Sequence, residues 1–179
     1  MSMFLRGFVE HFQDVLVASA TSIRSNEDLS AATPLTFTLD AQPDVPRRLV
    51  LTFDSHAQIM AFTIVITGVN AKGVVVTQTI TEASGWSIVT NEAFAVITNI
   101  IMTTRTGTGA GDTIDIGVND VVGLGNSLIA AADVFKVKKN NAHFTVASYT
   151  VEAVYDTVDL STGGAITGGD DFTIWYRAL

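Results

Sequence analysis

The sequence contains no cysteine, and this absence removes several kinds of chemistry. Without thiols the chain has no disulfide, no thiolate nucleophile and no Cys-based zinc site. Histidine is scarce too, because His11, His56 and His143 are the only ones and none has a partner at metal-ligand spacing. We therefore expect no metal or other cofactor, and stability must come from packing and association.

Charged residues are also scarce. Only 16% of the residues are charged, whereas a soluble globular domain usually has about 25%. The 18 acidic and 10 basic residues leave a net charge of -8, which argues against nucleic acid as a partner. The one basic cluster, Lys136, Lys138 and Lys139, is interpreted as a solubilising strand end. A chain with so few charges is expected to cover part of its surface with other protein.

Long hydrophobic runs are also missing, although 47% of the residues are hydrophobic. Thr, Gly, Asn or Asp interrupts every apolar stretch well before the ~20 residues that a membrane-spanning helix needs. The N-terminal segment lacks the apolar core of a signal peptide because Arg6, Glu10 and Asp14 interrupt it. We therefore expect no membrane partner, and we interpret this segment as part of the mature protein.

The first residues carry a pattern that occurs nowhere else in the chain. Apolar side chains recur there at spacings of three and four, which predicts one face of a short helix: Phe4, Leu5, Phe8, Val9 and Phe12. A helix this short is marginal in water and needs a surface to dock on, either its own domain or a neighbouring subunit. We predict an N-terminal arm or helix within residues 1–30 and treat these five residues as candidate interface residues.

From about residue 33 onward the hydrophobic period is two. Leu49, Leu51 and Phe53 fall on one face of a strand, and Gly- and Asp-rich breaks separate short segments of this kind. Roughly a dozen such segments predict an all-β protein in which residues 31–179 form a single β-sandwich domain, of jelly-roll or immunoglobulin-like type. The pattern does not decide between the two topologies.

One hairpin has a predicted register. If residues 69–73, VNAKG, form its loop, then Ile66 lies opposite Val76 and Thr63 opposite Thr79. The outer face would then carry a ladder of threonines, a sheet surface that needs no charge.

The segment around residue 100 is apolar on both faces. One set of alternating positions is Val96, Ile100 and Met102, and the other is Ala95, Ile97 and Ile101. A strand of this kind is expected to be covered on both sides. Because one sandwich buries one face of each sheet, the surplus predicts a homo-oligomer.

The glycines Gly107, Gly109 and Gly111 resemble a phosphate-binding loop in spacing only. Such a loop needs a helix N-terminus directly after it, and a P-loop also needs a lysine followed by Ser or Thr. A strand pattern without lysine follows here, so we predict the tip of a hairpin.

Carboxylates gather after this loop. Asp112, Asp115, Asn119 and Asp120 could together offer oxygens to a hard cation such as Ca²⁺. Alternation places Asp112 and Asp115 on opposite sides of a strand, which favours the alternative that they cap backbone N–H groups in turns. Asp170 and Asp171 receive the same interpretation.

No residue pattern indicates catalysis. A nucleophile elbow of the G-x-S-x-G type is absent from the sequence, so we expect no enzyme and predict no catalytic residue. Trp86, Trp175 and Tyr176 could form a sugar-stacking platform, although such residues more often close the core of a β-sandwich.

Three segments resemble structural proteins of tailed bacteriophages: TIVITGVNAKGVVVTQTIT, NEAFAVITNIIM and GAGDTIDIGVNDVVGL, with GGAITGGDDFTIWYRA at the C-terminal end. The similarity is best over residues 49–125. It implies a virion protein without catalytic residues, most simply a decoration or cement protein that stabilises the head by binding across subunits of the major capsid protein. It also implies a homotrimer on the outer capsid surface, present in the host cytoplasm during assembly. The alternatives are a tail, neck or fibre-associated virion protein and a carbohydrate-binding β-sandwich module.

Overall fold

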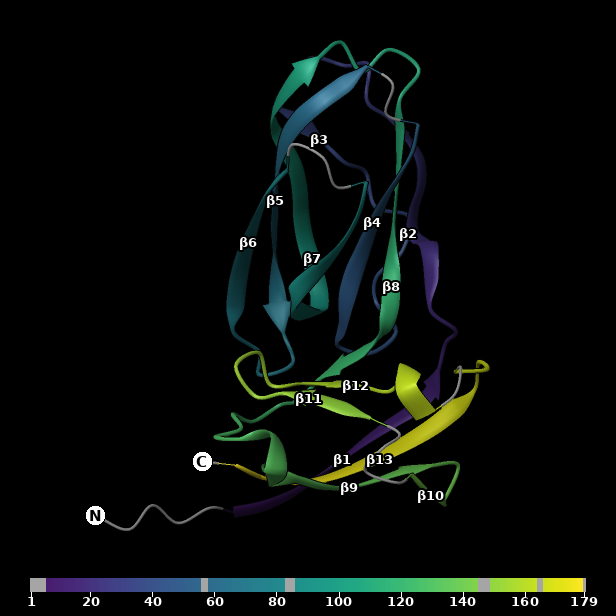
Figure 1. Ribbon diagram of the computed structural model, residues 1–179, viewed down its shortest axis with the longest axis vertical. Coiled ribbons are helices and arrows are strands. Elements are labelled where there is room, and N and C mark those ends of the chain that lie inside the picture. The colour runs from purple at the N-terminus through teal and green to yellow at the C-terminus, as the bar shows by residue number, and fades with distance from the viewer. Residues whose placement is uncertain (1–5, 56–57, 83–85, 145–148, 164–165, 179) are drawn as a thin grey trace, which may run out of the picture.

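The protein is described by a computed structural model that covers residues 6–178 except 56–57, 83–85, 145–148 and 164–165. It is an elongated all-β molecule, which confirms the predicted fold class. Figure 1 shows two parts stacked along the long axis, an upper sandwich and a lower sheet. The described residues contain short 3₁₀ turns at Ala131–Asp133 and Ser161–Gly163 but no α-helix.

The upper sandwich contains the strands β2 Ser19–Asp28, β3 Leu35–Thr36, β4 Arg47–Ser55, β5 Ile59–Asn70, β6 Val75–Glu82, β7 Ser87–Gly107 and β8 Thr113–Gly123. One layer has β4 between β8 and the first half of β7, with β2 beyond β8. The other layer consists of the second half of β7, which pairs with β3 and β5, and of β6, which pairs with β5. The 21-residue strand β7 thus passes from one layer to the other.

The core of the sandwich lies between these layers. Alternate residues of β4, β5 and β8, among them Leu51, Ile64 and Ile116, are fully buried there. The period of two in the sequence has this physical origin, because successive side chains of a strand point to opposite faces.

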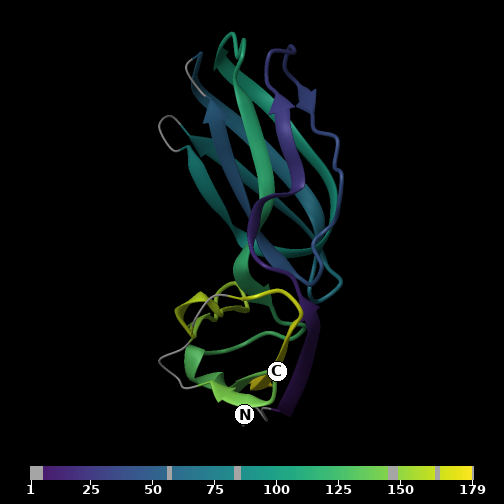
Figure 2. The same cartoon turned by 90° about the vertical axis from the view of Figure 1, so that its right-hand side faces the viewer.

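The lower part contains β1 Arg6–Val15, β9 Val134–Lys139, β10 Ala142–Phe144 and β13 Asp170–Ala178, in the order β1-β13-β9-β10. Two further strands, β11 Thr150–Glu152 and β12 Thr157–Asp159, continue the sheet of β8 downward. A second hydrophobic cluster, which includes Phe12, Val122, Leu160 and Phe172, fills the space between these strands and the lower sheet. In Figure 2 the chain runs from β1 below into β2 above.

The helix expected at the N-terminus is wrong, because residues 6–15 form strand β1. It pairs antiparallel with β13, from Arg6 opposite Ala178 to Phe12 opposite Phe172. In a strand, Phe8 and Phe12 share a face whereas Val9 points to the other side. Partners from the far end of the chain thus override a helical spacing that the segment could not stabilise alone.

Residues 16–28, which also fell within the expected arm, lead into and form β2 of the sandwich. The described part of residues 1–30 is therefore built into both sheets.

The predicted hairpin exists, but its register differs by two residues. Ile66 lies opposite Gln78 and Thr63 opposite Thr81. The turn is shorter than VNAKG because Val69 still pairs with Val75, and Gly73 takes a positive φ of 74°. The Asn70 side chain accepts hydrogen bonds from the N–H groups of Lys72 and Val74, so the turn begins only after Asn70.

Strand β7 does not alternate as its sequence suggests. Ile97, Ile100 and Met102 are buried together, whereas Val96 and Thr98 are exposed. Irregular pairing with β5 near Gly68 shifts the alternation by one residue. Between Val96 and Met102, therefore, the described residues bury only one face of this strand.

Candidate interaction surfaces

A wide sheet surface without charge lies on the outside of β5, β6 and β7. It is formed by the outward side chains of residues 63–69, 75–81 and 96–104, none of which is charged. We call this surface the uncharged face. Val75 is 70% exposed and Val96 46% exposed, and the other outward positions are mostly threonine. Such a surface is suited to burial against another protein, because nothing on it requires charge compensation.

The threonines of the uncharged face are ordered by hydrogen bonds. The hydroxyls of Thr63 and Thr81 lie 3.2 Å apart, and those of Thr67 and Thr77 lie 3.4 Å apart. The Thr98 hydroxyl donates to the Thr67 carbonyl at 2.9 Å. The ladder that the sequence predicted is present, with partners moved by the register difference.

The uncharged face ends at β6, the outermost strand of its sheet. Its pairing with β5 is regular, and residues 75–81 contain no proline and no lysine. Monomeric proteins usually protect such an edge with charge, proline or a bulge. In β6 none of these devices occurs between Val75 and Thr81.

The opposite end of the molecule has a different surface, the outward side of the lower sheet. Register places Val9, Trp175 and Lys136 in one row, and His11, Thr173, Lys138 and His143 in the next. The Nζ atoms of Lys136 and Lys138 lie 4.7 and 5.8 Å from the centre of the Trp175 ring. We call this surface, with Arg177 beside it, the basic face.

The two parts meet at a buried arginine. Arg47, at the start of β4, is fully buried and donates hydrogen bonds of 2.7 Å to the carbonyls of both Leu16 and Asn119. Its guanidinium also lies 3.3 Å from Asp44 and 3.2 Å from Asp120. Burial raises the pKa of Asp120, an effect that the nearby Arg47 opposes.

A buried carboxylate, Asp170, ties β13 to β9. Its oxygens accept hydrogen bonds from Lys139, from the Thr167 backbone and from the Asn140 amide, at 2.7 to 2.8 Å. Burial alone would raise the pKa of Asp170, but these donors outweigh it and lower the pKa to about 2. The carboxylate therefore stays ionised and holds the end of the lower sheet.

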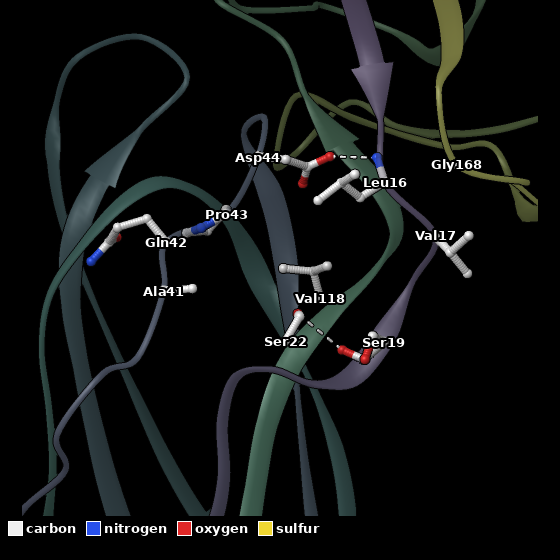
Figure 3. Close-up of a pocket in the computed structure, with 10 residues that line it drawn as sticks. All are labelled: Leu16, Val17, Ser19, Ser22, Ala41, Gln42, Pro43, Asp44, Val118 and Gly168. Atoms are coloured by element: carbon white, nitrogen blue, oxygen red, sulfur yellow. Dashed lines mark hydrogen bonds between the residues drawn. The ribbon is translucent and has the colours of Figure 1, made fainter.

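An apolar pocket of about 390 Å³ opens where β1 passes into β2. Figure 3 shows Leu16, Val17, Pro43 and Val118 among the side chains that line it. At its rim the Leu16 N–H donates to Asp44 at 2.8 Å. The pocket has few polar groups that could orient a ligand.

A polar pocket of about 230 Å³ lies at the end of the lower sheet, beside His11, Asn141 and Asp171. The ring Nδ1 of His11 is 3.0 Å from the Thr173 hydroxyl. Asp171 accepts the N–H of Asp14 at 3.0 Å, so this carboxylate holds the backbone.

The carboxylates considered for a cation cap backbone groups instead of converging. Asp112 accepts the N–H of Gln58 at 2.9 Å, and Asp115 accepts the N–H of Asn26 at 2.7 Å. Asn119 accepts the N–H of Val121, two residues on. Across the described part of the chain, no group of three His, Cys, Asp or Glu side chains is placed to hold a metal. The capping part of the interpretation is confirmed for Asp112 and Asp115, but the N–H groups that they cap lie 54 and 89 residues away along the chain and not in their own turn.

The glycine string forms the connection between β7 and β8. Gly107, Gly109 and Gly111 all have positive φ, and a strand follows at Thr113. A side chain at Gly107 would meet the Gln58 carbonyl at 1.8 Å, so the close approach of two backbones requires glycine there. The segment is a loop, as predicted, but it is not the tip of a hairpin, because in the described residues β8 pairs with β2 and β4 and not with β7.

The aromatic candidates for sugar stacking do not lie together. Trp86 packs edge-on against Phe53 at 5.6 Å in the upper core, whereas Trp175 lies on the basic face. Tyr176 is buried in the lower cluster, where its hydroxyl donates to Glu10 and burial raises its pKa.

Of the five candidate interface residues, Phe4 and Leu5 lie outside the described residues. Phe8 stacks on Tyr176 with ring centres 5.7 Å apart, and Phe12 is buried in the lower cluster. Val9 is 48% exposed, on the basic face. The structure thus separates the residues that the helical spacing had grouped.

Two features were missed from the sequence. Arg47 could have been noticed, because it stands just before the apolar strand segment of residues 49–51. The basic face could not, since it requires the pairing of β13 with both β1 and β9.

Comparison of the chain with known protein families, characterised proteins and solved structures finds no match. Among the described residues, no helix has the length and hydropathy needed to cross a bilayer.

Proposed function

We propose that the protein is a non-enzymatic structural protein of a tailed-phage particle, which binds the outside of the head across capsid subunits. The observation that carries this proposal is the uncharged face, with its exposed valines and its open strand edge. Proteins that work by being buried against other proteins need such a surface.

The resemblance in the sequence adds to this support. Residues 49–125, which resemble phage structural proteins, include most of β4 and all of β5, β6, β7 and β8. The strands that bear the resemblance are therefore the same strands that bear the uncharged face.

The same surface suits association between copies of the chain. A patch that is buried by closed rotational symmetry leaves no free edge for growth of fibres. We propose a homo-oligomer on the particle, and the resemblance alone supplies the number three. The major capsid protein is the other expected partner.

Cryo-electron microscopy of particles from the phage that encodes this chain tests the proposal. We expect density for the elongated two-part molecule on the outside of the head. Density confined to the tail, neck or fibres would contradict the decoration role and favour the alternative of a tail-associated protein.

A binding test shows whether the protein attaches to the head through the uncharged face. Purified chain should bind heads that lack it, and a variant with V75K and T79K on the uncharged face should bind at least tenfold more weakly. The matched variant with A110K and V154K adds the same charge at two other exposed positions and should bind normally. Equal loss in both variants would contradict a role for the uncharged face.

A further inference from the structure

The basic face carries positive charge although the protein as a whole is acidic. The chain has a net charge of -8, yet three cations lie on the outward side of the lower sheet: Lys136, Lys138 and Arg177. Asp171 lies at the far end of β13, and Asp133, directly before β9, lies 3.7 Å from the Arg177 guanidinium. The basic residues are therefore segregated from most of the acidic ones.

Internal pairing does not explain the two lysines at the centre of this face. Most other cations are used within the fold, such as Arg24 with Glu27, Arg47 with Asp120 and Lys72 with Asp156. Within the described residues, Lys136 and Lys138 have no carboxylate in ion-pair range. Their charges remain available to a partner.

Trp175 holds these two lysines in place. Both ammonium groups lie within 6 Å of the ring centre, a geometry in which the cation is attracted to the π-system. Both lysine side chains are half-buried on the sheet. Lysines that are ordered in advance lose less conformational entropy when a partner binds.

Apolar groups accompany the charges. Val9 is 48% exposed and Phe135 is 51% exposed, and both belong to the strands that flank Trp175. Charge together with exposed apolar area is typical of a protein interface, in which the apolar part supplies affinity and the charge supplies orientation and rate.

We infer that the basic face is a docking surface for an acidic protein segment, which lays carboxylates against Lys136 and Lys138. A nucleic acid fits the surface less well, because the lysines occupy the face of Trp175 on which a base would stack. The net charge of -8 also opposes a long polyanion. This inference does not rest on the proposed function, since it concerns the opposite end of the molecule and a different partner surface.

The test uses the full chain and a fluorescein-labelled polyglutamate peptide, followed by fluorescence anisotropy at low ionic strength. We expect saturable binding that weakens as salt is added, because the Debye length falls from about 10 Å at 0.1 M to about 3 Å at 1 M. The double variant K136Q and K138Q should bind about tenfold more weakly, in line with two lost charge contacts. Absence of binding by the natural chain would overturn the inference.

Two control variants keep the result specific. The variant with A110E and V154E lowers the net charge by the same two units at exposed sites outside the lower sheet, and it should keep its affinity. The variant with K136R and K138R keeps the charge and should restore binding to within about threefold of the natural chain. Equal weakening in the A110E and V154E variant would show that overall charge, and not this face, governs binding.

A parallel titration with labelled oligothymidylate distinguishes the two classes of partner. We expect weaker binding than for polyglutamate. Tighter binding of the oligonucleotide, lost in the K136Q and K138Q variant, would overturn the inference in favour of a nucleic-acid surface.

Discussion

At the scale of single residues, Arg47 links segments that are far apart in the chain through hydrogen bonds. It contacts the link between β1 and β2 through the Leu16 carbonyl, and β8 through Asn119 and Asp120. All of these contacts form out of water, because the side chain is fully buried. A buried charge of this kind is stable only while its partners are in place.

Replacement of Arg47 by leucine should lower the free energy of unfolding by about 3–5 kcal/mol, because buried carbonyls and carboxylates lose their donor. Urea denaturation followed by circular dichroism measures this difference. R24L is the matched control, since Arg24 pairs with Glu27 and Asp40 at a more exposed site and should contribute less than about 1 kcal/mol. Similar losses in the two variants would contradict the role given to Arg47.

Asp170 gives the protein a defined response to acid. Its pKa is about 2 in the folded chain and 3.8 for the ordinary group, so its ionised form stabilises the fold above pH 3.8. This stability is lost as the pH falls toward 2. D170N should therefore be less stable than the natural chain by roughly 2 kcal/mol at pH 7, and the two should converge near pH 2. Chemical denaturation across this pH range tests the prediction, and a difference that stays constant would contradict it.

The sequence predicted the functions of some polar residues better than others. Asp112 and Asp115 follow a glycine-rich turn, where a carboxylate that caps N–H groups is expected. That they cap N–H groups was predictable, but their partners, which lie 54 and 89 residues away along the chain, were not. Lys136 and Lys138 alternate on one strand, so a shared face was predictable in principle. Their contact with Trp175 was not, because it depends on a pairing between strands more than thirty residues apart.

At the scale of secondary structure, β1 belongs to the core of the lower part. Phe12 and Val15 are buried in the lower cluster, and β1 covers one edge of β13. Removal of this strand would expose apolar side chains of β13 and leave its edge unpaired. A shortened chain without residues 1–15 is therefore not expected to form the lower sheet.

A point substitution tests the same strand with less disturbance. F12A should lower the free energy of unfolding by about 3–5 kcal/mol, because a buried ring leaves a cavity. V9A, on the exposed side of the same strand, should change it by less than about 0.5 kcal/mol. If the two substitutions cost the same, β1 would have to be a detachable arm.

The alternation of hydrophobic residues along the sequence predicted most of the strands, but it did not predict how the strands pair in register. The hairpin of β5 and β6 differs by two residues from its prediction because a side-chain contact of Asn70 tightens the turn. In β7 the irregular pairing beside Gly68 reverses which residues face the core. Both features depend on backbone geometry that hydrophobic pattern alone does not encode.

At the scale of the whole molecule, the uncharged face predicts self-association. Sedimentation of the purified chain should give a mass above that of one 19.0 kDa chain, with a trimer expected from the resemblance. The variant with V75K and T79K should sediment as a smaller species because it places like charges in the interface. The variant with A110K and V154K should sediment like the natural chain. A monomeric natural chain would contradict self-association through this face.

The pairing of β1 with β13 also governs how the protein is made. Strands β2 to β8 follow one another along the chain, so the upper sandwich has all of its own strands once residue 123 has emerged from the ribosome. The lower sheet forms later, because β1 pairs with β13 and Arg6 can meet Ala178 only after residue 178 has been synthesised. During that interval Phe12 and Val15 lack their partners in β13. The nascent chain therefore exposes an apolar N-terminal segment beside a folded upper sandwich. Chains that stop before β13 has been made would leave Phe12 and Val15 exposed, so such shortened products should be the ones that aggregate or are degraded in the cell.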